Sequence, residues 1–326
     1  MSISPLLQAR DLVKRYPVRH RLTRRLIGHV NAVNGVGLDV FPGETLAVVG
    51  ESGCGKSTLG RVLTRLIEPT GGTVQFEGRD LGTLGVEELR RLRRDLQIVF
   101  QDPNSSLNPR MTVRQILDAP FRYQRTAARE PAEALLERVG LRPEHADRHP
   151  HEFSGGQAQR IGIARALALR PKLVVCDEPV SALDVSVQAQ ILNLLRDLQE
   201  EDGLAYLFIS HDLAAVRQIC TRVAVMYLGS IVEIADRDAF YGGALHPYSH
   251  ALVSAVPIPE PTAERSRQRI VLHGDPPSPL APPSGCPFRT RCPKAASICA
   301  VEKPPLVEHR PGHLAACHFP GERTIA

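Results

Sequence analysis

Residues 50–57 read Gly-Glu-Ser-Gly-Cys-Gly-Lys-Ser, and this glycine-rich run constrains the fold more than any other feature of the sequence. The apolar run Thr45–Val49 before it predicts a buried strand, and the segment after Lys56 predicts a helix. A strand, a glycine loop and a helix in that order form the front of an α/β unit. Glycines allow backbone N–H groups to converge on phosphate oxygens, and the helix N-terminus adds a favourable dipole. The chain is therefore predicted to be an α/β protein that binds a phosphate-bearing ligand.

Two side chains of this phosphate loop (residues 50–57) have the chemistry of a nucleoside triphosphate site. Lys56 is expected to reach the β- and γ-phosphates, and the Ser57 hydroxyl is expected to ligate Mg²⁺. A chance glycine loop is the alternative, but the strand before it and the helix after it argue against chance.

A second motif lies far downstream, where Asp177 and Glu178 follow the apolar run Leu173–Cys176. In an open α/β sheet, a carboxylate at the carboxyl end of a strand faces the crevice in which ligands bind. Asp177 is then expected to hold Mg²⁺, directly or through water, and Glu178 to polarise the attacking water as a general base. Taken alone, two acids at a strand end are more often solvated; with a phosphate loop in the same chain, a hydrolytic site is favoured.

Composition narrows the function classes. The chain has 326 residues, of which 43% are hydrophobic and 23% charged, which is typical of a globular protein of one large or two smaller domains. No run approaches the ~18 uninterrupted apolar residues of a membrane helix, and the start of the chain lacks a signal-peptide core. The net charge of +5 comes without an aromatic-interleaved basic stripe, so no nucleic-acid partner is expected. A cytoplasmic protein is predicted, with any membrane role acting through a partner.

A basic cluster lies between Lys14 and Arg25. A run of this kind is usually a solvated face, and contact with anionic lipid headgroups is the alternative.

Ser154, Gly155, Gly156 and Gln157 follow Phe153 and precede a helical segment. This run resembles the LSGGQ signature of the ATP-binding cassette (ABC) family, with Phe153 at its first position. The serine and the paired glycines open a helix whose N-terminus can bind an anion. The resemblance implies a head-to-tail dimer in which this signature contacts the ATP held by another subunit. It also implies an α/β phosphate-loop NTPase fold, with a RecA-like core, an antiparallel β subdomain and a helical subdomain.

Further family elements occur in the same order. By this resemblance Gln101 contacts Mg²⁺ or the attacking water, Asp184 belongs to the loop that communicates across the dimer, His211 contacts the γ-phosphate, and Tyr16 stacks on adenine. The resemblance thus implies hydrolysis of ATP with Mg²⁺ as cofactor. The expected ATP contacts are Tyr16, Gly50, Ser52, Gly53, Gly55, Lys56, Ser57 and Thr58; the expected magnesium contacts are Ser57, Gln101 and Asp177; the expected catalytic residues are Glu178, His211 and Gln101.

Three stretches resemble one branch of the family, the oligopeptide and dipeptide (peptide/nickel) importers, and in particular their second ATPase subunit. They are Gln101–Arg110, His151–Phe153 and Leu245–Ser249. The resemblance implies a subunit that energises peptide uptake from the cytoplasmic face of the inner membrane. It implies as partners a second ABC ATPase in a heterodimer, two transmembrane permeases and an extracytoplasmic substrate-binding protein. Import of nickel or another small solute is the alternative, and a non-transport ABC ATPase or a catalytically inactive subunit is less favoured.

The composition of the sequence changes after residue 241. Residues 257–283 are rich in proline, which disfavours helices and central strands there. We therefore expect a nucleotide-binding domain over residues 1–243, with its helical subdomain at about 102–165. Residues 244–326 are expected to form a small, loop-rich C-terminal extension.

Four of the seven cysteines lie in the last 41 residues, spaced C-x5-C-x6-C-x17-C: Cys286, Cys292, Cys299 and Cys317. In a reducing compartment this clustering indicates metal ligation before disulfides. Zinc sites commonly use tight C-x2–4-C pairs, whereas four widely spaced thiolates suit a [4Fe–4S] cluster. The tail also resembles the extension of peptide-importer ATPases, some of which carry such a cluster. A [4Fe–4S] cluster is predicted, with Zn²⁺ or no metal as alternatives.

Overall fold

The computed structural model describes residues 4–21, 23–128, 130–257 and 269–321. The chain forms two compact units, each assembled from segments that are distant in sequence. Unit 1 consists of Met1–Leu7, Asp39–Thr45 and Gln75–Ser210, and unit 2 consists of Gln8–Leu38, Leu46–Val74 and His211–Ala326.

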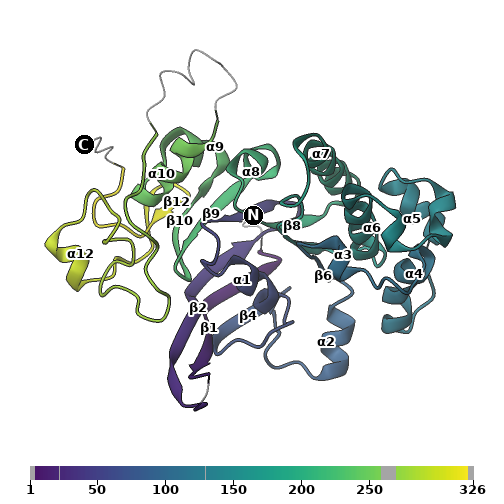
Figure 1. The fold of residues 1–326 in the computed structure, drawn as a ribbon, viewed down its shortest axis with the longest axis horizontal. Coiled ribbons are helices and arrows are strands. Elements are labelled where there is room, and N and C mark those ends of the chain that lie inside the picture. The colour runs from purple at the N-terminus through teal and green to yellow at the C-terminus, as the bar shows by residue number, and fades with distance from the viewer. Residues whose placement is uncertain (1–3, 22, 129, 258–268, 322–326) are drawn as a thin grey trace. The chain divides into compact units, whose positions relative to one another are not determined.

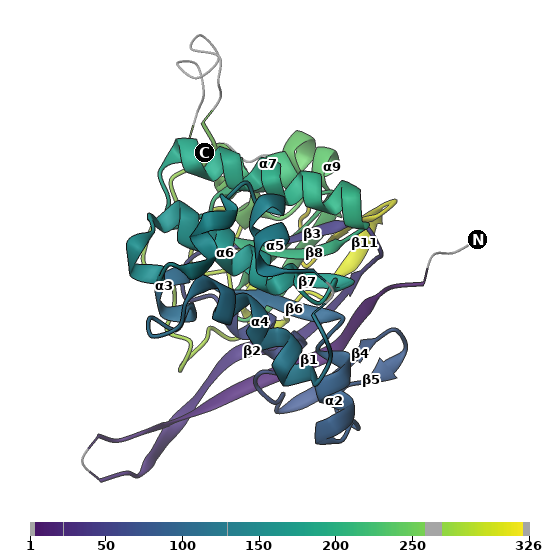
Figure 2. The same ribbon diagram turned by 90° about the vertical axis from the view of Figure 1, so that its right-hand side faces the viewer.

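Three parallel strands form the centre of unit 1: β6 (Leu96–Val99), β7 (Leu173–Asp177) and β8 (Ala205–Ser210). The register places Val175 of β7 opposite Ile98 of β6 on one side. Every residue of β7 and β8 is buried, as expected for parallel strands covered on both faces. Figure 2 shows these three strands one beside another. The carboxyl ends of β6 and β7 therefore meet at the same edge.

Helices make up most of the rest of unit 1. Their bounds, with the two-residue β5, are β5 (Arg79–Asp80), α2 (Val86–Leu92), α3 (Pro103–Ser106), α4 (Val113–Gln124), α5 (Ala132–Arg138), η1 (Pro143–Asp147), η2 (Pro150–Glu152), α6 (Gly155–Leu167) and α7 (Val185–Asp202). Helix α6 contacts β6 and the three helices α3, α4 and α5 (Figure 1). Helices α3, α4, α5 and most of α6 fall within residues 102–165, where the sequence predicts a helical subdomain.

One sheet of unit 2 runs in the order β11-β12-β10-β9-β3. Their bounds are β3 (Thr45–Val49), β9 (Arg222–Tyr227), β10 (Ser230–Asp236), β11 (Val307–Arg310) and β12 (His313–Ala315). Strands β3 and β9 are parallel, and the others pair antiparallel. Gly229, at a φ of 81°, makes the tight turn between β9 and β10, a conformation that glycine adopts without strain.

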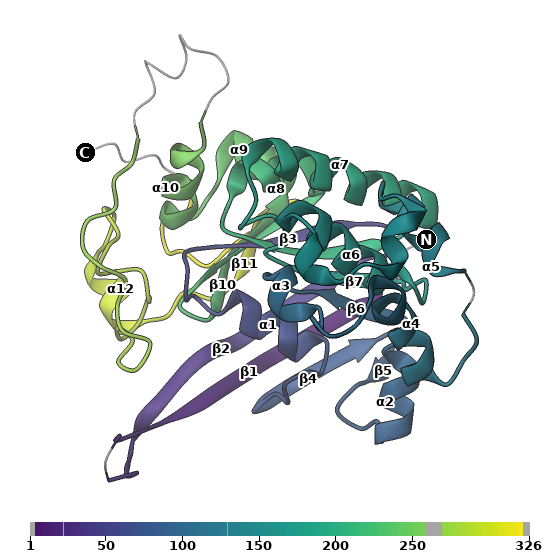
Figure 3. The same cartoon turned by 45° about the vertical axis from the view of Figure 1, so that its right-hand side comes forward.

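A second sheet carries β1 (Leu7–Arg19) beside β2 (Leu26–Val40), with β4 (Gly71–Phe76) on the other side of β1. Figure 3 shows β1 and β2 as one long ribbon. The first half of β2 is exposed or half-buried and lacks apolar alternation, so local patterning gives little sign of this strand. The basic cluster from Lys14 to Arg25 lies at the far end of this ribbon and is largely exposed.

The helices of unit 2 are α1 (Lys56–Leu63), α8 (Leu213–Ile219), α9 (Arg237–Gly243), α10 (Pro247–Ala255) and α12 (Ser297–Val301). Within the described ranges, every helix of the chain falls short of the length and hydropathy needed to span a bilayer. Helix α10 and strands β11 and β12 lie in the tail that the sequence predicted to be loop-rich.

Glu233 of β10 is fully buried, and it holds the start of α10 and β12 in place. Its two carboxylate oxygens accept hydrogen bonds from the backbone N–H groups of Leu245 and His246, each at 2.7 Å. The Nε2 atom of His313, on β12, lies 2.7 Å from Glu233 Oε1. One buried carboxylate thus joins three segments of unit 2.

Acidification is expected to destabilise unit 2 through His246. Burial lowers the pKa of its imidazole from 6.5 to about 4, against an opposing effect of Glu233. The unfolded chain therefore binds more protons between these two pH values, so the free energy of unfolding should fall as pH is lowered from 6.5 toward 4, by about 3 kcal/mol for this group. Urea midpoints measured at pH 7.5, 6 and 5 check this.

His246→Asn is the matched variant for that measurement, because Nδ1 of His246 accepts the N–H of Tyr248 and an asparagine carbonyl can replace this acceptor. The variant should lose the part of the pH dependence that His246 contributes. An unchanged pH dependence would contradict the assignment.

Candidate active site

The phosphate loop in unit 2 is closed by Lys56. This side chain is buried, and its Nζ atom donates hydrogen bonds to the carbonyl oxygens of Gly50, at 2.8 Å, and Glu51, at 3.0 Å. Helix α1 begins at Lys56, so Ser57 and Thr58 lie in its first turn, which contains no acidic residue. The loop therefore places a buried ammonium and a helix N-terminus together, which suits an anion.

Three glycines of the loop adopt positive φ: Gly50 at 155°, Gly53 at 79° and Gly55 at 110°. At Gly50 an added Cβ atom would lie 2.2 Å from the carbonyl oxygen of Met226, and at Gly55 it would lie 2.0 Å from that of Ala32. Backbone packs so closely against the loop that no side chain fits at either position. The residues present thus fit a phosphate cradle, with Ser52 and Gly53 exposed at its rim.

In unit 1 the structure brings Gln101 and Glu178 together. Gln101 follows β6 and Glu178 follows β7, and Nε2 of Gln101 donates a hydrogen bond of 2.9 Å to Oε2 of Glu178. Asp177, the last residue of β7, is 1% exposed. The sequence predicted acids at the carboxyl end of a strand, and the pairing of β6 with β7 accounts for the approach of Gln101.

Glu178 has a φ of 49°, in the left-handed region that few non-glycine residues adopt. Its N–H donates to the carbonyl oxygen of Ile209, at 3.0 Å, and its own carbonyl oxygen accepts from the Ser181 hydroxyl, at 3.1 Å. The surrounding strand and loop thus hold the main chain of Glu178 in this strained conformation, which is typical of functional sites.

Asp184 lies at the end of the loop that follows Glu178. Its Oδ1 atom accepts hydrogen bonds from the Ser186 hydroxyl, at 2.7 Å, and from the backbone N–H of Val187, at 2.9 Å. These bonds lower the pKa of its carboxyl group. In this chain Asp184 is the N-cap of α7, a structural role that stands beside the predicted role in a dimer.

The signature residues open helix α6. The Ser154 hydroxyl oxygen accepts the N–H of Gln157 at 3.3 Å, and Oε1 of Gln157 accepts the N–H of Ser154 at 3.1 Å. This reciprocal pair is a capping box. The first turn contains no acidic residue. Phe153 packs edge-on against His145 with ring centroids 5.3 Å apart, which explains how a bulkier ring replaces leucine in the signature.

Gly156→Ala is expected to destabilise unit 1, because an added Cβ atom would lie 2.5 Å from Cγ1 of Val187 on α7. Separating the two helices should lower the free energy of unfolding by about 1–3 kcal/mol. Gly162→Ala on the same helix is the control, since no atom lies within 4 Å of the added Cβ. The control should raise stability by about 0.5–1 kcal/mol. Urea denaturation compares the two, and equal effects would contradict the packing argument.

Tyr16 and His211 lie on unit 2. Tyr16 is 36% exposed on β1, with Nζ of Lys14 5.2 Å from its ring centroid. His211 is exposed and precedes α8, which Asp212 caps by accepting the N–H groups of Ala214 and Ala215. An exposed ring and an exposed imidazole are accessible to a ligand.

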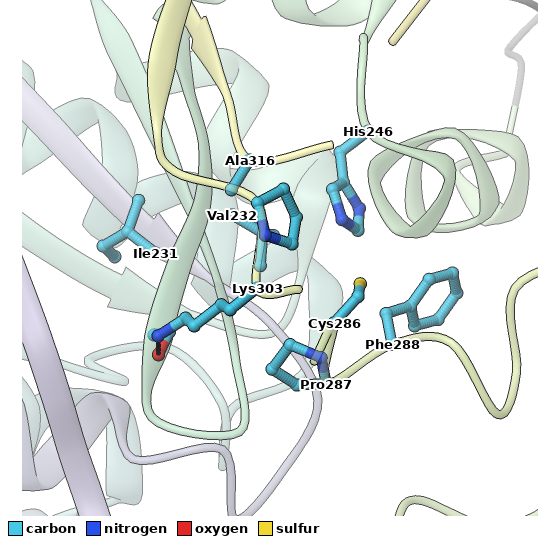
Figure 4. Close-up of a pocket in the computed structure, with 10 residues that line it drawn as sticks. Ile231, Val232, His246, Cys286, Pro287, Phe288, Lys303 and Ala316 are labelled. Carbon is cyan, nitrogen blue, oxygen red and sulfur yellow. Dashed lines mark hydrogen bonds between the residues drawn. The ribbon is translucent and has the colours of Figure 1, made fainter. Parts of the chain in front are cut away.

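The four tail cysteines, all within the described residues, are free thiols. Burial raises the pKa of Cys286 and Cys317, and raises that of Cys292 to about 11, with the other three cysteines adding to the rise. The Cys286 N–H donates to the carbonyl oxygen of Cys299 at 2.8 Å. Cys286 also lines a small pocket with Phe288, Lys303 and His246 (Figure 4).

These thiols do not form a ready metal site. Among the residues that the structure describes, no three His, Cys, Asp or Glu side chains are grouped so as to hold a metal ion. The four cysteines predicted to bind a [4Fe–4S] cluster or Zn²⁺ therefore lie in the same part of the tail, but their side chains are not arranged to coordinate a metal ion.

Sequence reasoning missed Tyr248 and Arg291, which contact Glu51 of the phosphate loop. Tyr248 lies in a stretch that carries the family resemblance, and Arg291 lies next to Cys292. Neither position carries a local signal of contact with Glu51, which lies 197 and 240 positions earlier, respectively.

Two family models match the chain: "ABC transporter" over residues 33–181, and "Oligopeptide/dipeptide transporter, C-terminal region" over residues 232–299. A solved dimeric structure of the ATP-binding cassette MJ0796, bound to ADP and Pi, is 29% identical and covers 71% of this chain and 98% of its own, with a TM-score of 0.63. Fold and site thus define an ABC ATPase, a phosphate-loop enzyme that binds ATP and Mg²⁺ and hydrolyses ATP.

Curated relatives cover nearly the whole chain. The oligopeptide transport ATP-binding protein AppF of Bacillus subtilis (strain 168) is 53% identical over 96% of this chain and 97% of its own. The probable peptide ABC transporter ATP-binding protein y4tS of Sinorhizobium fredii is 55% identical over 96% of this chain and 89% of its own. The chain belongs to the ATP-binding proteins of ABC transporters, in the branch with the oligopeptide/dipeptide transporter C-terminal region.

Proposed function

We propose that this chain is the ATP-hydrolysing subunit of an ABC importer that energises uptake of di- and oligopeptides through separate permease subunits. The observation that carries the proposal is one chain with a phosphate loop, a Gln101–Glu178 pair and a capped signature helix, followed by the oligopeptide/dipeptide transporter region. The names of AppF and y4tS, which include oligopeptide and peptide transport, support the substrate class.

The nucleotide-binding roles follow from the chemistry of each side chain. Lys56 binds the β- and γ-phosphates, and Ser57, Gln101 and Asp177 hold Mg²⁺, which when bound neutralises charge on the phosphates. Tyr16 stacks on adenine. The other proposed ATP contacts are Gly50, Ser52, Gly53, Gly55 and Thr58.

The catalytic roles fall to three residues. Glu178 accepts a proton from the attacking water, and the amide of Gln101, which donates to this carboxylate, orients it. His211 contacts the γ-phosphate. The signature residues Ser154, Gly155, Gly156 and Gln157 act on ATP held by a second ATPase, and Asp184 lies in the loop between the two.

The proposed assembly is a heterodimer of this chain with another ABC ATPase on the cytoplasmic face of the inner membrane. Two permeases and an extracytoplasmic substrate-binding protein complete it. Residues 1–243 are the proposed nucleotide-binding domain, with residues 102–165 as the subdomain that contacts the permeases. Residues 244–326 are the proposed extension.

Purification of the membrane complex through a tag on this chain tests the assembly, with co-purifying proteins identified by mass spectrometry. Uptake of labelled dipeptides, longer peptides and nickel into proteoliposomes then tests the substrate. ATP-dependent peptide uptake is expected. Nickel uptake without peptide uptake would favour the alternative importer, and co-purification with ribosomes in place of permeases would contradict transport.

For the tail, the proposal is a [4Fe–4S] cluster on Cys286, Cys292, Cys299 and Cys317, with Zn²⁺ as the alternative. The cysteine spacing supports it. The thiols would have to move together, since the described residues hold no three-ligand group. Anaerobic purification with iron, sulfide and zinc analysis, and absorbance at about 400 nm, tests it. Absence of both metals would contradict a metal site.

A further inference from the structure

The C-terminal extension reaches the phosphate loop through Arg291, one residue before Cys292. The Nη1 and Nη2 atoms of Arg291 donate to the two carboxylate oxygens of Glu51 at 2.8 and 3.0 Å. The Arg291 side chain is 7% exposed and that of Glu51 30% exposed. A bidentate pair of this kind fixes both distance and orientation, and limited access to water strengthens it.

A second contact acts on the same residue. The backbone N–H of Glu51 donates to the phenolic oxygen of Tyr248, on α10, at 2.8 Å. The Glu51 carbonyl oxygen accepts from Nζ of Lys56 at 3.0 Å. Tyr248 and Arg291 therefore hold the main chain and the side chain of the residue that positions the phosphate-binding lysine.

The two contacts rest on a buried aromatic cluster of Tyr227, Tyr248 and Phe288. Their ring centroids lie 4.8 Å (Tyr227 to Tyr248), 5.2 Å (Tyr227 to Phe288) and 5.4 Å (Tyr248 to Phe288) apart, and each ring is at most 1% exposed. Figure 4 shows Phe288 in the same tail segment as Cys286. Phe288 thereby anchors the segment that carries Arg291, since packed aromatic rings leave it little freedom.

Because Glu51 is negatively charged, its ion pair with Arg291 is expected to affect nucleotide binding. Glu51 lies inside a loop that binds the phosphates of ATP, and an uncompensated carboxylate there would repel them. A positively charged side chain is needed to neutralise this carboxylate. Arg291, which lies 240 residues later in the chain, is that side chain.

We infer that Arg291 and Tyr248 are positioning residues for ATP binding, so that the C-terminal extension is part of the nucleotide site. Arg291 neutralises and orients Glu51, and Tyr248 holds its main chain. The inference rests on the proposed role of the phosphate loop in binding ATP. It extends that role to a region outside the family's nucleotide motifs.

Steady-state ATP hydrolysis by the purified transporter complex that contains this chain, with Mg²⁺, tests the inference through KM and kcat. Arg291→Gln is expected to raise KM for ATP about tenfold, because it leaves a carboxylate beside the phosphates. The kcat value should change much less. In the double variant Glu51→Gln/Arg291→Gln, the repelling charge is gone, and KM should return to within about threefold of the wild-type value.

Two further variants make the result unambiguous. Arg291→Lys keeps the charge without the bidentate geometry and should give an intermediate KM. Arg310→Gln removes an exposed positive charge from the same tail and should leave KM unchanged. A wild-type KM in Arg291→Gln, or a raised KM that Glu51→Gln does not correct, would overturn the inference. Failure of the wild-type complex to hydrolyse ATP would instead overturn the proposed function.

Discussion

Glu178→Gln is expected to bind ATP as the wild-type chain does and to hydrolyse it at least about 100-fold more slowly. The substitution keeps the size of the side chain and removes the proton acceptor. Oε2 of Glu178 accepts a hydrogen bond from Gln101, which orients the carboxylate. Calorimetric titration with ATP and release of phosphate measure the two properties separately.

Glu200→Gln is the matched control, because Glu200 is an exposed acid on α7 of the same unit. It should retain the wild-type rate of hydrolysis. A Glu178→Gln variant that hydrolysed ATP at the wild-type rate would refute the assignment of Glu178 as the base. A variant that no longer bound ATP would indicate that the carboxylate acts in binding.

Glu233→Ala is expected to lower the free energy of unfolding by about 3–5 kcal/mol, because each buried donor left without its acceptor costs about 1–3 kcal/mol. The fully buried carboxylate accepts hydrogen bonds from the main chain of Leu245 and His246 and pairs with His313. Burial raises the pKa of Glu233, but these hydrogen bonds outweigh that effect and hold the pKa below 4.5. Urea denaturation at neutral pH measures the loss.

Because the folded-state pKa of Glu233 is depressed, its contribution is complete above pH 4.5 and is lost as pH falls through the folded-state value. The difference in stability between wild type and Glu233→Ala should therefore shrink on acidification. Asp238→Ala is the control, since Asp238 is exposed and pairs with its neighbour Arg237. The control should leave stability nearly unchanged, and a large loss there would argue against burial as the cause.

The parts of the site with short, chemically demanding motifs were predictable from the sequence. The loop around Lys56 needs glycines because the main chain at Met226 and Ala32 packs directly against Gly50 and Gly55. This requirement leaves a pattern of glycines that can be recognised in the sequence. The acids at Asp177 and Glu178 follow a fully apolar run, which only a covered parallel strand explains. The α/β fold, with antiparallel and helical parts, is confirmed by the structure and its neighbours.

The contacts made by the tail could not be predicted from local patterns. Strand β12 pairs with β10 over only two residue pairs, too short for a period of alternation to be read. Arg291 and Glu51 are far apart in sequence. Nothing in the sequence around Arg291 indicates that it is buried or that it pairs with Glu51. Long-range pairs of this kind depend on the assembled fold, which local propensity does not encode.

Strands β11 and β12 lie beyond residue 299, where the match to the transporter C-terminal model ends, yet β12 covers one side of β10. A protein shortened at that point would present the bare main-chain N–H and C=O groups of β10 to other molecules. An exposed edge strand of this kind can pair with strands of neighbouring chains and so promote aggregation. A chain cut after residue 299 should therefore be insoluble when expressed. A chain that keeps the β11–β12 hairpin should remain soluble.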